Sequence, residues 1–385
     1  MSSKPLKNKK SSRIVVTDAA AVTALGNSQE ELWQRLMAGE TAIRPIRRFP
    51  VDQEHYKAKI AAHIDDLKPA NNRTMLLGLL DRLLLEMGPV PPDAALITAT
   101  IKSGADNLES FCRGRQADFQ DVMLSSIADI AGDRLGLRSN GICISASCAS
   151  STIAVAHAAG LIKSGRARTV LVCCGDLITE YAFSGFSALK ALSPFPCRPF
   201  DRDRNGLSLG EGAAALLLMD AERARREDYH RLGTILGWGI ANDATHITAP
   251  AKSGRGLVQA VVQALQTAGR KAEEITAVSA HGTGTVYNDL MELNAFRRLF
   301  GERKVPMYSI KGAIGHTLGA AGGIEVIQGL KALAAGMIPP TVGYSNPEKG
   351  AEGQVSPEPQ TVSGDYLLTT NSGFGGVNAA LVLGR

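Results

Sequence analysis

Short apolar segments alternate along this 385-residue chain with longer segments that carry a helical pattern. The short segments are bounded by glycine or polar clusters, which is typical of strands buried on both faces of a sheet. They occupy residues 14–17, 95–98, 169–174, 213–219, 275–280, 307–310 and 379–383. Predicted helices lie between them at residues 151–163, 256–268, 288–300 and 322–335. This alternation predicts an α/β protein whose sheets are largely covered by helices.

A charged stretch at residues 222–231 separates two α/β blocks. We therefore expect an N-terminal half over residues 14–230 and a C-terminal half over residues 231–385. No convincing internal repeat relates the two, so any duplication has been erased from the residues. Three of the predicted helices are followed by a glycine that can end a helix in left-handed backbone. These glycines are Gly165, Gly269 and Gly336.

Positive charge is concentrated at the N-terminus. The formal net charge is +5, and the first basic residues are Lys4, Lys7, Lys9, Lys10 and Arg13. We expect residues 1–13 to form a basic, flexible tail, and the near-neutral remainder indicates no nucleic-acid partner. The tail lacks the apolar segment of a secretory signal, and no run of about 18 apolar residues occurs elsewhere. These features predict a cytoplasmic protein that does not span a membrane.

Six cysteines occur without the spacing of a disulfide framework or a metal site. They are Cys112, Cys143, Cys148, Cys173, Cys174 and Cys197. Cys148 lies among small residues directly before a predicted helix, in the segment SASCASSTIAVAHAAG. The positive end of the helix macrodipole favours a thiolate there, and small neighbours allow a tight turn that presents the sulfur to a substrate. A buried structural cysteine is the alternative, and it is our interpretation of the other five.

Two histidines follow predicted strands in glycine-rich segments. His281 belongs to SAHGTGTVYND, where Thr283 and Thr285 place hydroxyl groups on a flexible turn. His316 belongs to SIKGAIGHTLGAAGGIE, where Lys311 lies beside the turn. Each glycine in a helix costs about 0.5–1 kcal/mol relative to alanine, so their number predicts a backbone packed closely against a ligand or another segment. Taken alone, His281 could equally be a loop histidine with satisfied hydrogen bonds.

A fourth segment, NSGFGGVN, places Phe374 in a Gly-Phe-Gly-Gly turn before the last predicted strand. Taken together, the four segments closely resemble those of the elongating β-ketoacyl-acyl-carrier-protein synthases. The residues that carry the resemblance are, in chain order, Cys148, His281, Lys311, His316 and Phe374. The resemblance covers nearly the whole chain, including RPFDRDRNGLSLGEGAAALLL and NDATHITAPAKSGRG near its centre. The Cys-His-His pattern separates this family from the thiolases and from the initiating Cys-His-Asn synthases.

The resemblance implies a thiolase-like fold, with two pseudo-symmetric α/β halves stacked as five layers, α-β-α-β-α. It implies an acyltransferase that joins malonyl-acyl-carrier protein to an enzyme-bound acyl chain by decarboxylative Claisen condensation. The substrates would be carried on the phosphopantetheine of acyl-carrier protein, and no metal or other cofactor is implied. The expected partners are acyl-carrier protein and a second subunit, either an identical copy or a chain-length-factor-like protein.

The family's catalytic roles carry over to matching positions. Cys148 would be the nucleophile that takes the acyl chain as a thioester. His281 and His316 would assist decarboxylation and stabilise the enolate. Lys311 would support the His316 segment electrostatically, and the backbone N–H of Phe374, a gating residue, would form the oxyanion hole with that of Cys148.

Substrate-binding roles are implied for four further residues. Thr283 and Thr285 match the threonines that hold the pantetheine arm, while Ser372 and Arg204 are expected beside the substrate. Because carrier proteins of this type are acidic, we also expect a basic rim for docking. Its candidate residues are Arg44, Arg47, Arg48, Lys57, Lys59 and Arg204.

The chain departs from the family pattern at several positions. TDAAAVTALG and ITATIKSGADN stand where the family commonly has glycine-rich turns. Ser279, Thr369 and Thr370 differ from the asparagine-rich set that binds a monovalent cation in some members, so the resemblance does not extend to that site. Ser372 stands where many members have a second phenylalanine, which predicts a wider and more polar pocket mouth that tolerates bulky, unsaturated or oxygenated chains.

Three functions remain open from the sequence. The first is condensation in fatty-acid elongation. The second is the catalytic ketosynthase subunit of a type II polyketide or aryl-polyene pathway, whose members the NSGFGG ending also resembles. The third, a non-catalytic chain-length-factor-like scaffold, is disfavoured because such partners lack the active-site cysteine and this chain has Cys148.

Overall fold

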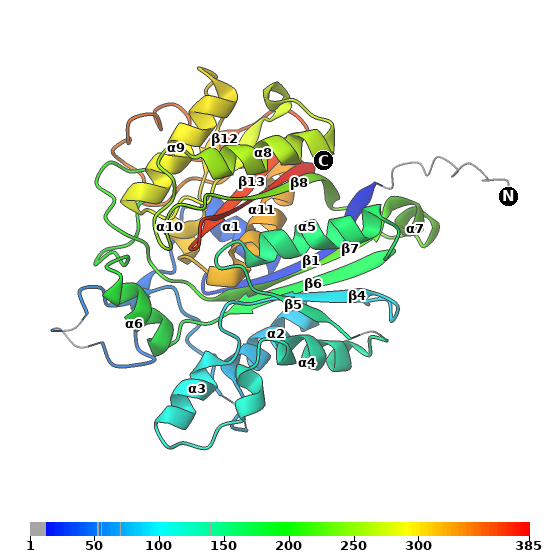
Figure 1. Cartoon of the computed structure of the whole chain (residues 1–385), viewed down its shortest axis with the longest axis vertical. Coiled ribbons are helices and arrows are strands. Elements are labelled where there is room, and N and C mark those ends of the chain that lie inside the picture. Colours follow the sequence, from blue (N-terminus) through cyan, green and yellow to red (C-terminus); the bar gives the residue numbers. More distant parts are fainter. Residues whose placement is uncertain (1–12, 52–53, 55, 70, 139) are drawn as a thin grey trace.

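The structure is a computed structural model that describes residues 13–51, 54, 56–69, 71–138 and 140–385 (Figure 1). The predicted flexible tail lies outside the described residues, apart from Arg13. Among the described residues, the strands of the main sheet form two successive groups in the sequence. The first group is β1 (Ile14–Thr23), β4 (Ala95–Ala99), β5 (Ile142–Ile144), β6 (Thr169–Asp176) and β7 (Gly212–Asp220). The second group is β8 (Gly233–Asn242), β9 (Ala277–Ser279), β10 (Met307–Tyr308), β13 (Tyr366–Gly373) and β14 (Val377–Gly384).

The two groups have the same topology. In spatial order the first reads β1-β7-β6-β4-β5 and the second reads β8-β14-β13-β9-β10, which is the same order of first, fifth, fourth, second and third strands. The strand directions also correspond, because the first three strands of each group pair antiparallel and the last three pair parallel. A short antiparallel pairing of β1 with β8 joins the groups into one ten-stranded sheet. The predicted pseudo-symmetric halves are therefore confirmed.

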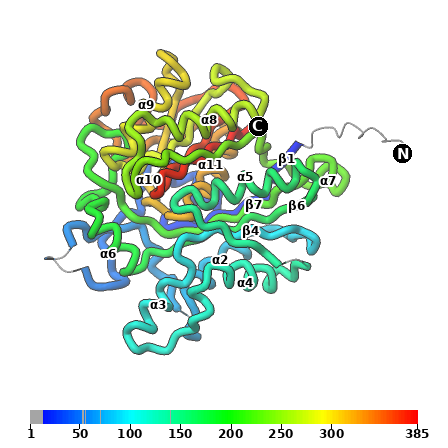
Figure 2. Tube along the Cα trace, viewed as in Figure 1, coloured from blue at the N-terminus to red at the C-terminus, as the bar shows by residue number. Residues whose placement is uncertain are grey.

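Helices cover both faces of each half and produce five layers (Figures 1 and 2). The outer layers hold α2 (Met75–Leu85) and α4 (Ser126–Leu135) on one side, with α8 (Arg255–Ala268) and α9 (Val286–Phe300) on the other. The inner layer holds α5 (Ser150–Lys163) and α11 (Ala321–Ala335), which contact strands of both halves. The predicted α-β-α-β-α arrangement is confirmed.

The remaining elements are short or lie at the edges of these layers. The helices are α1 (Gln29–Met37), α3 (Ala105–Cys112), α6 (Glu180–Ala188), α7 (Ala221–Arg226), α10 (Lys311–Ile314) and the 3₁₀ turns η1 (Phe119–Val122), η2 (Ala272–Glu274) and η3 (Leu318–Ala320). Two small two-stranded sheets pair β2 (Arg44–Pro45) with β3 (Ile60–Ala61) and β11 (Met337–Ile338) with β12 (Gln360–Thr361).

The sheets are buried on both faces, as the continuous apolar runs predict. In β6, Cys173 packs into the outer core beneath α2 while its neighbour Cys174 packs into the inner core around α5 and α11. A third core lies between the C-terminal strands and helices α8 and α9. Successive residues of a strand point to opposite faces, so a strand between two cores needs apolar residues at every position.

Two glycines of α11 let the inner helices pack closely. A Cβ at Gly322 would lie 1.9 Å from Oγ1 of Thr152 on α5, and one at Gly323 would lie 2.6 Å from Sγ of Cys174. Neither distance is possible without movement of the neighbour. The glycine-rich segment before and within α11 is therefore packed against other segments, which confirms one of the two predicted reasons for its composition.

The predicted elements lie close to the observed ones. All seven predicted strands and all four predicted helices overlap an observed element of the same type. Gly165, Gly269 and Gly336 each have the positive φ expected after a helix. Two long strands, β8 and β13, were not predicted from the sequence.

Candidate active site

Cys148 lies in a sharp turn between β5 and α5. Ser147 precedes it with a φ of +51°, in the left-handed region that residues other than glycine rarely adopt. The hydroxyl of Ser150 holds this turn, because it accepts a hydrogen bond from the N–H of Ala146 at 2.8 Å and donates one to the carbonyl of Ser147 at 2.6 Å. The strained turn places the cysteine at the start of an inner helix, as its small neighbours predict.

The two predicted histidines come from the other half of the molecule. His281 follows the end of β9, and its backbone N–H donates to Oε1 of Glu292 at 2.8 Å. His316 lies between α10 and η3, and its backbone N–H donates to the carbonyl of Ser208 at 2.7 Å. Both segments are therefore fixed through the backbone.

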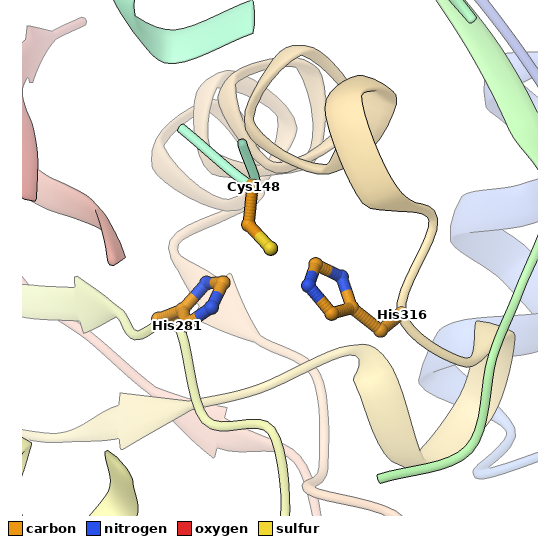
Figure 3. Close-up of side chains that lie close together, drawn as sticks. All are labelled: Cys148, His281 and His316. Atoms are coloured by element: carbon orange, nitrogen blue, oxygen red, sulfur yellow. The ribbon is translucent and has the colours of Figure 1, made fainter. Parts of the chain in front are cut away.

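The structure brings Cys148, His281 and His316 together (Figure 3). Sγ of Cys148 and one ring nitrogen of each histidine lie within 4.8 Å of one another. The two rings are nearly perpendicular, with centroids 5.2 Å apart and an interplanar angle of 86°. Figure 3 shows the sulfur pointing toward the rings from the opposite side of the site. One thiol and two imidazoles, which are groups that can act as a nucleophile and as proton donors or acceptors, therefore lie close together in one site.

Burial and a neighbouring cation keep both imidazoles neutral at pH 7. Burial lowers the pKa of His281 well below 6.5, and the positive charge of Lys311 and the ring of His316 lower it further. Burial and the Lys311 charge do the same to the pKa of His316. Since a neutral imidazole carries one N–H and one lone pair, each ring can donate one hydrogen bond and accept one proton.

The expectation that Cys148 favours a thiolate is wrong for the resting site. Burial raises the pKa of the Cys148 thiol to about 11, and the Lys311 charge and the backbone N–H groups of Cys148 and Phe374 offset only part of the increase. Only 6% of the residue is exposed to solvent. The loss of hydration on burial thus favours the protonated thiol, so the sulfur carries its proton until a base removes it.

Lys311 is buried and lies in an ion pair behind the histidines. Its Nζ donates to Oε1 of Glu325 at 2.5 Å, and the side chains of both residues are 2% exposed. Nζ also donates to the backbone carbonyl of His281. Lys311 lies close to His316 in the chain, but Nζ donates to the backbone of His281 instead. Lys311 acts on His316 only through its charge, which lowers the pKa of that ring.

Phe374 lies beside Cys148, with its backbone directed at the sulfur. The backbone N–H groups of Phe374 and Cys148 both lower the pKa of the Cys148 thiol, as donors placed next to Sγ do. The carbonyl of Phe374 accepts a hydrogen bond from the Ser147 hydroxyl at 3.0 Å, which fixes the peptide. The Phe374 ring stacks on Phe186 of α6, with centroids 5.7 Å apart. The N–H groups of Cys148 and Phe374 therefore both lie next to Sγ.

A cavity of about 300 Å³ leads to these residues. Thr283 and Thr285 line it, and their hydroxyl oxygens lie 2.9 Å apart. Ser372 also lines it, next to Phe374, and its hydroxyl donates to Oδ1 of Asn378 at 2.7 Å. Three of the four predicted substrate-binding residues therefore face the same cavity as Cys148 and the histidines.

Arg204 does not face this cavity, and the prediction that it contacts substrate or a docking partner needs correction. The guanidinium is buried, and Nη1 donates to Oε2 of Glu348 at 2.6 Å. Nε and Nη2 donate to the carbonyls of Thr285 at 3.2 Å and Val286 at 3.0 Å. Arg204 therefore holds the backbone beside Thr285 in place, because a buried guanidinium needs partners for its donors.

Arg48 likewise does not belong to an exposed basic rim. It forms a bidentate ion pair with the fully buried Glu211, and this carboxylate also accepts the N–H groups of Ile64 and Ile178. Two other predicted rim residues, Arg47 and Lys57, are exposed. The sequence could not distinguish exposed Arg47 from paired Arg48, because the partner of Arg48, Glu211, is distant in the sequence.

Two buried residues at the site were missed by the sequence analysis. Glu292 on α9 accepts the N–H groups of His281 and Gly282, at 2.8 and 2.7 Å. Asn371 on β13 lies within hydrogen-bond distance of the His281 ring. A carboxylate among apolar residues eleven positions after His281 was the signal that could have identified Glu292, whereas Asn371 lies in a strand that was not predicted.

The fold and this site together define a condensing enzyme of the thiolase-like class. Family models agree: the model of the β-ketoacyl synthase N-terminal domain matches residues 11–75 and 98–224, and that of the C-terminal domain matches residues 232–345. The chain belongs to the β-ketoacyl synthase family, whose members are acyltransferases. The family predicted from the sequence is confirmed.

Relatives match over nearly their whole length. The chain is 31% identical to the 3-oxoacyl-[acyl-carrier-protein] synthase 2 of Vibrio cholerae, over 97% of this chain and 99% of the relative. It is 30% identical to the enzyme of the same name from Synechocystis, over 97% and 98%. Among solved structures it is similar to the ishigamide ketosynthase/chain length factor, with a TM-score of 0.88, 27% identity and coverage of 98% and 100%. A ketosynthase in complex with its chain length factor from Xenorhabdus doucetiae has a TM-score of 0.82 at 25% identity, over 100% of both chains.

No helix in the described part of the chain is long and apolar enough to cross a bilayer.

Proposed function

We propose that this chain catalyses the decarboxylative condensation of malonyl-acyl-carrier protein with an acyl chain held on Cys148, in fatty-acid elongation. The observation that carries the proposal is the convergence of Sγ with two neutral imidazoles within 4.8 Å, beside a cavity of about 300 Å³. The names of the Vibrio and Synechocystis relatives support the pathway.

Acyl transfer is the first half of the reaction. A neighbouring neutral imidazole removes the proton of the Cys148 thiol as Sγ attacks the carbonyl carbon of an acyl thioester. The negative charge that develops on the carbonyl oxygen is met by the backbone N–H groups of Cys148 and Phe374. The pantetheine sulfur then leaves with the electron pair of the broken C–S bond and takes the proton. Covalent attachment separates this transfer from the condensation that follows.

Condensation is the second half. The bond between the malonyl carboxyl group and its α-carbon breaks, CO₂ leaves, and the electron pair delocalises onto the thioester oxygen. The N–H groups of His281 and His316 donate hydrogen bonds to that oxygen, so no base is required to form the carbanion. The carbanion attacks the thioester carbon on Cys148 and a C–C bond forms. Sγ leaves with the electron pair of the broken C–S bond and takes up a proton that comes from solvent. These steps call on side chains and backbone only, and we propose that no metal takes part.

The carrier and the second subunit complete the proposal. The hydroxyls of Thr283 and Thr285 lie where a pantetheine arm can pass along the cavity. We infer that acyl-carrier protein delivers the substrates, aided by exposed basic residues such as Arg47 and Lys57. We also propose a dimer, with an identical copy or a chain-length-factor-like partner, because β5 is an edge strand of the main sheet and exposes 47% of Ile142.

A second candidate is the ketosynthase subunit of a type II polyketide or aryl-polyene pathway. Two observations favour it. Solved ketosynthase/chain length factor structures are similar to this chain over 98% and 100% of its length. Ser372 also places a hydroxyl, in place of a large apolar group, on the wall of the cavity next to Phe374. The chemistry at Cys148 is the same in both pathways, so only the acyl substrate distinguishes them.

The test is acylation and condensation with purified acyl-carrier proteins. Wild-type enzyme should become acylated on Cys148, shown by peptide mapping, and should release CO₂ from malonyl-acyl-carrier protein. Cys148→Ala should abolish acylation, whereas Cys112→Ala, which changes an exposed cysteine, should leave it intact. Acylation of another cysteine, or no acylation by any chain in a panel of saturated, polyenoyl and aryl-enoyl substrates, would refute the proposal. The preferred member of the panel decides between the two pathways.

A further inference from the structure

Asn371 forms a hydrogen-bonded link between the buried ion pair and the ring of His281. It lies in β13, and no part of it is exposed to solvent. Its Nδ2 lies 2.8 Å from Oε2 of Glu325 and 3.1 Å from Nδ1 of His281. Its Oδ1 accepts a hydrogen bond from the hydroxyl of Thr152 on α5. Every polar atom of the amide therefore has a buried partner.

The orientation of the amide is determined by its charged neighbour. Glu325 is paired with Lys311, with Nζ and Oε1 at 2.5 Å, so its carboxylate can only accept hydrogen bonds. The atom of Asn371 that faces Oε2 must therefore be the NH₂ group. The opposite atom is then the oxygen, which suits the Thr152 hydroxyl as a donor. The reverse orientation would place an oxygen against a carboxylate in a fully buried site, which is strongly unfavourable.

This orientation decides which nitrogen of His281 carries the proton. One hydrogen of the NH₂ group points to Glu325, and the other is directed at Nδ1 of His281. A nitrogen that faces a donor must offer its lone pair. In a neutral imidazole the single proton is then on Nε2, the other ring nitrogen of a residue that lines the cavity.

We propose that Asn371 is a positioning residue that holds His281 in the Nε2–H tautomer, so that the ring presents a donor to the thioester oxygen. The effect on decarboxylation rests on the proposed function, whereas the contact between Asn371 and His281 does not depend on it. One chain of contacts holds the ring in this state. The ammonium of Lys311 orients the carboxylate of Glu325, which orients the amide of Asn371, and the amide orients the imidazole of His281. The opposite tautomer would direct a lone pair at the developing enolate and repel it.

His316 is held differently. Neither of its ring nitrogens has a hydrogen-bond partner among the described residues. Its tautomer is therefore not fixed by a neighbour as that of His281 is. The two histidines thus differ in whether a neighbour fixes the tautomer of the ring. His281 presents a donor, whereas His316 can present either a donor or an acceptor to the sulfur of Cys148.

The decisive variant is Asn371→Asp, which keeps the shape and replaces the NH₂ group with oxygen. Because that oxygen also faces Oε2 of Glu325, the two carboxyl groups share one proton between them, and the lone pair of the Asp oxygen is directed at His281. An oxygen facing Nδ1 requires a proton there, so the Nε2 donor of the neutral ring is lost. Nitrogen-15 spectra of histidine-labelled protein should show a protonated Nε2 and a bare Nδ1 for wild-type His281, and a protonated Nδ1 in Asn371→Asp. The chain has seven histidines, and His281→Ala identifies the resonance by its absence.

Kinetics provide the second readout. Asn371→Asp should release CO₂ from malonyl-acyl-carrier protein about 10²–10³-fold more slowly, the usual effect of losing one such donor. Acylation of Cys148 should stay within a few fold of wild type, which also shows that the variant is folded. Asn371→Ala, which leaves Nδ1 without a partner, should fall between the two in decarboxylation. Asn294→Asp, the same change at a residue that binds the Lys252 carbonyl, should match wild type in both assays.

The outcomes separate this inference from the proposed function. If wild-type enzyme releases no CO₂ from malonyl-acyl-carrier protein, the proposed function is wrong, and the spectra still test the role of Asn371. If Nδ1 of wild-type His281 is protonated, or Asn371→Asp decarboxylates as fast as wild type, the positioning role is overturned. A bare Nδ1 together with a selective loss of decarboxylation supports it.

Discussion

Replacing Gly322 with alanine tests whether close packing of the two inner helices holds the site together. The new Cβ would meet Oγ1 of Thr152 at 1.9 Å and Oδ1 of Asn371 at 2.6 Å. Overpacking of this kind costs about 1–3 kcal/mol, and breaking the Thr152–Asn371 hydrogen bond adds about 0.5–1.5 kcal/mol. Alanine is the better residue in a helix by about 0.5–1 kcal/mol. We therefore expect the free energy of unfolding to fall by about 1–3 kcal/mol, and decarboxylation to slow because Asn371 is displaced.

Urea unfolding followed by tryptophan fluorescence measures the change in the free energy of unfolding. Gly329→Ala is the matched control in the same helix. Its Cβ would meet only side-chain methyl carbons, of Leu383 at 2.9 Å and Leu367 at 3.2 Å, and these can move. We expect this control to change the free energy of unfolding by less than about 1 kcal/mol.

Thr152→Ala in the Gly322→Ala background removes the atom nearest to the new Cβ, so it should recover part of the loss in stability. Equal stabilities for Gly322→Ala and Gly329→Ala, or no recovery in the double variant, would show that the contact between α5 and α11 is not what requires a glycine.

Three further predictions concern the chemistry and the partners. Because the pKa values of His281 and His316 lie well below 6.5, both rings should stay neutral as the pH falls from about 8 to about 6, and the decarboxylation rate should be flat over that range; a loss of rate with a midpoint near 6.5 would contradict this. Ser372→Phe should shift the ratio of kcat/KM values toward saturated over polyenoyl or aryl-enoyl chains by about tenfold or more, since about 1.5–3 kcal/mol of apolar burial is regained; an unchanged ratio would mean that this position does not set specificity. Arg47→Glu should raise the KM for acyl-carrier protein and reduce its dependence on salt, whereas an unchanged KM at low salt would remove this residue from the docking surface.

The sequence predicted those strands whose pattern is set by burial alone. Strand β8 was missed because Gly237 and Gly239 interrupt its apolar pattern. Their hydrogens face helix α8, where a Cβ would lie 2.2 Å from the carbonyl oxygen of Ala264 and 2.0 Å from that of Ala260. The glycines are required by close packing between a helix and a strand, and no local pattern distinguishes that requirement from a turn.

Strand β13 was missed for a functional reason. Its second half reads Thr-Thr-Asn-Ser and is buried, although these residues are usually exposed. Asn371 and Ser372 are buried there because they bind other polar groups of the site. A strand that carries part of an active site departs from the apolar pattern by which strands are recognised.

The structure brings the three residues of the predicted Cys-His-His pattern together, while their catalytic roles stay predictions. Cys148, His281 and His316 could be identified because each stands in a segment with a distinctive composition. The ionisation of Cys148 could not be predicted, because it depends on how much water the folded protein leaves around the sulfur. The same limit applies to Arg204, whose partners Glu348 and Thr285 are distant in the sequence.

The repeated topology explains why the site lies where it does. In each half the third strand leads through a turn to an inner helix: β5 leads to α5 past Cys148, and β10 leads to α11 past His316. The two inner helices pack against each other at Gly322, so their beginnings, and the turns before them, meet at one point. His281 follows β9, the second strand of its half, and so reaches the same point from the parallel neighbour of β10. Two equivalent turns thus bring Cys148 from one half against His316 from the other, with the Lys311–Glu325 pair and Asn371 buried beside His281.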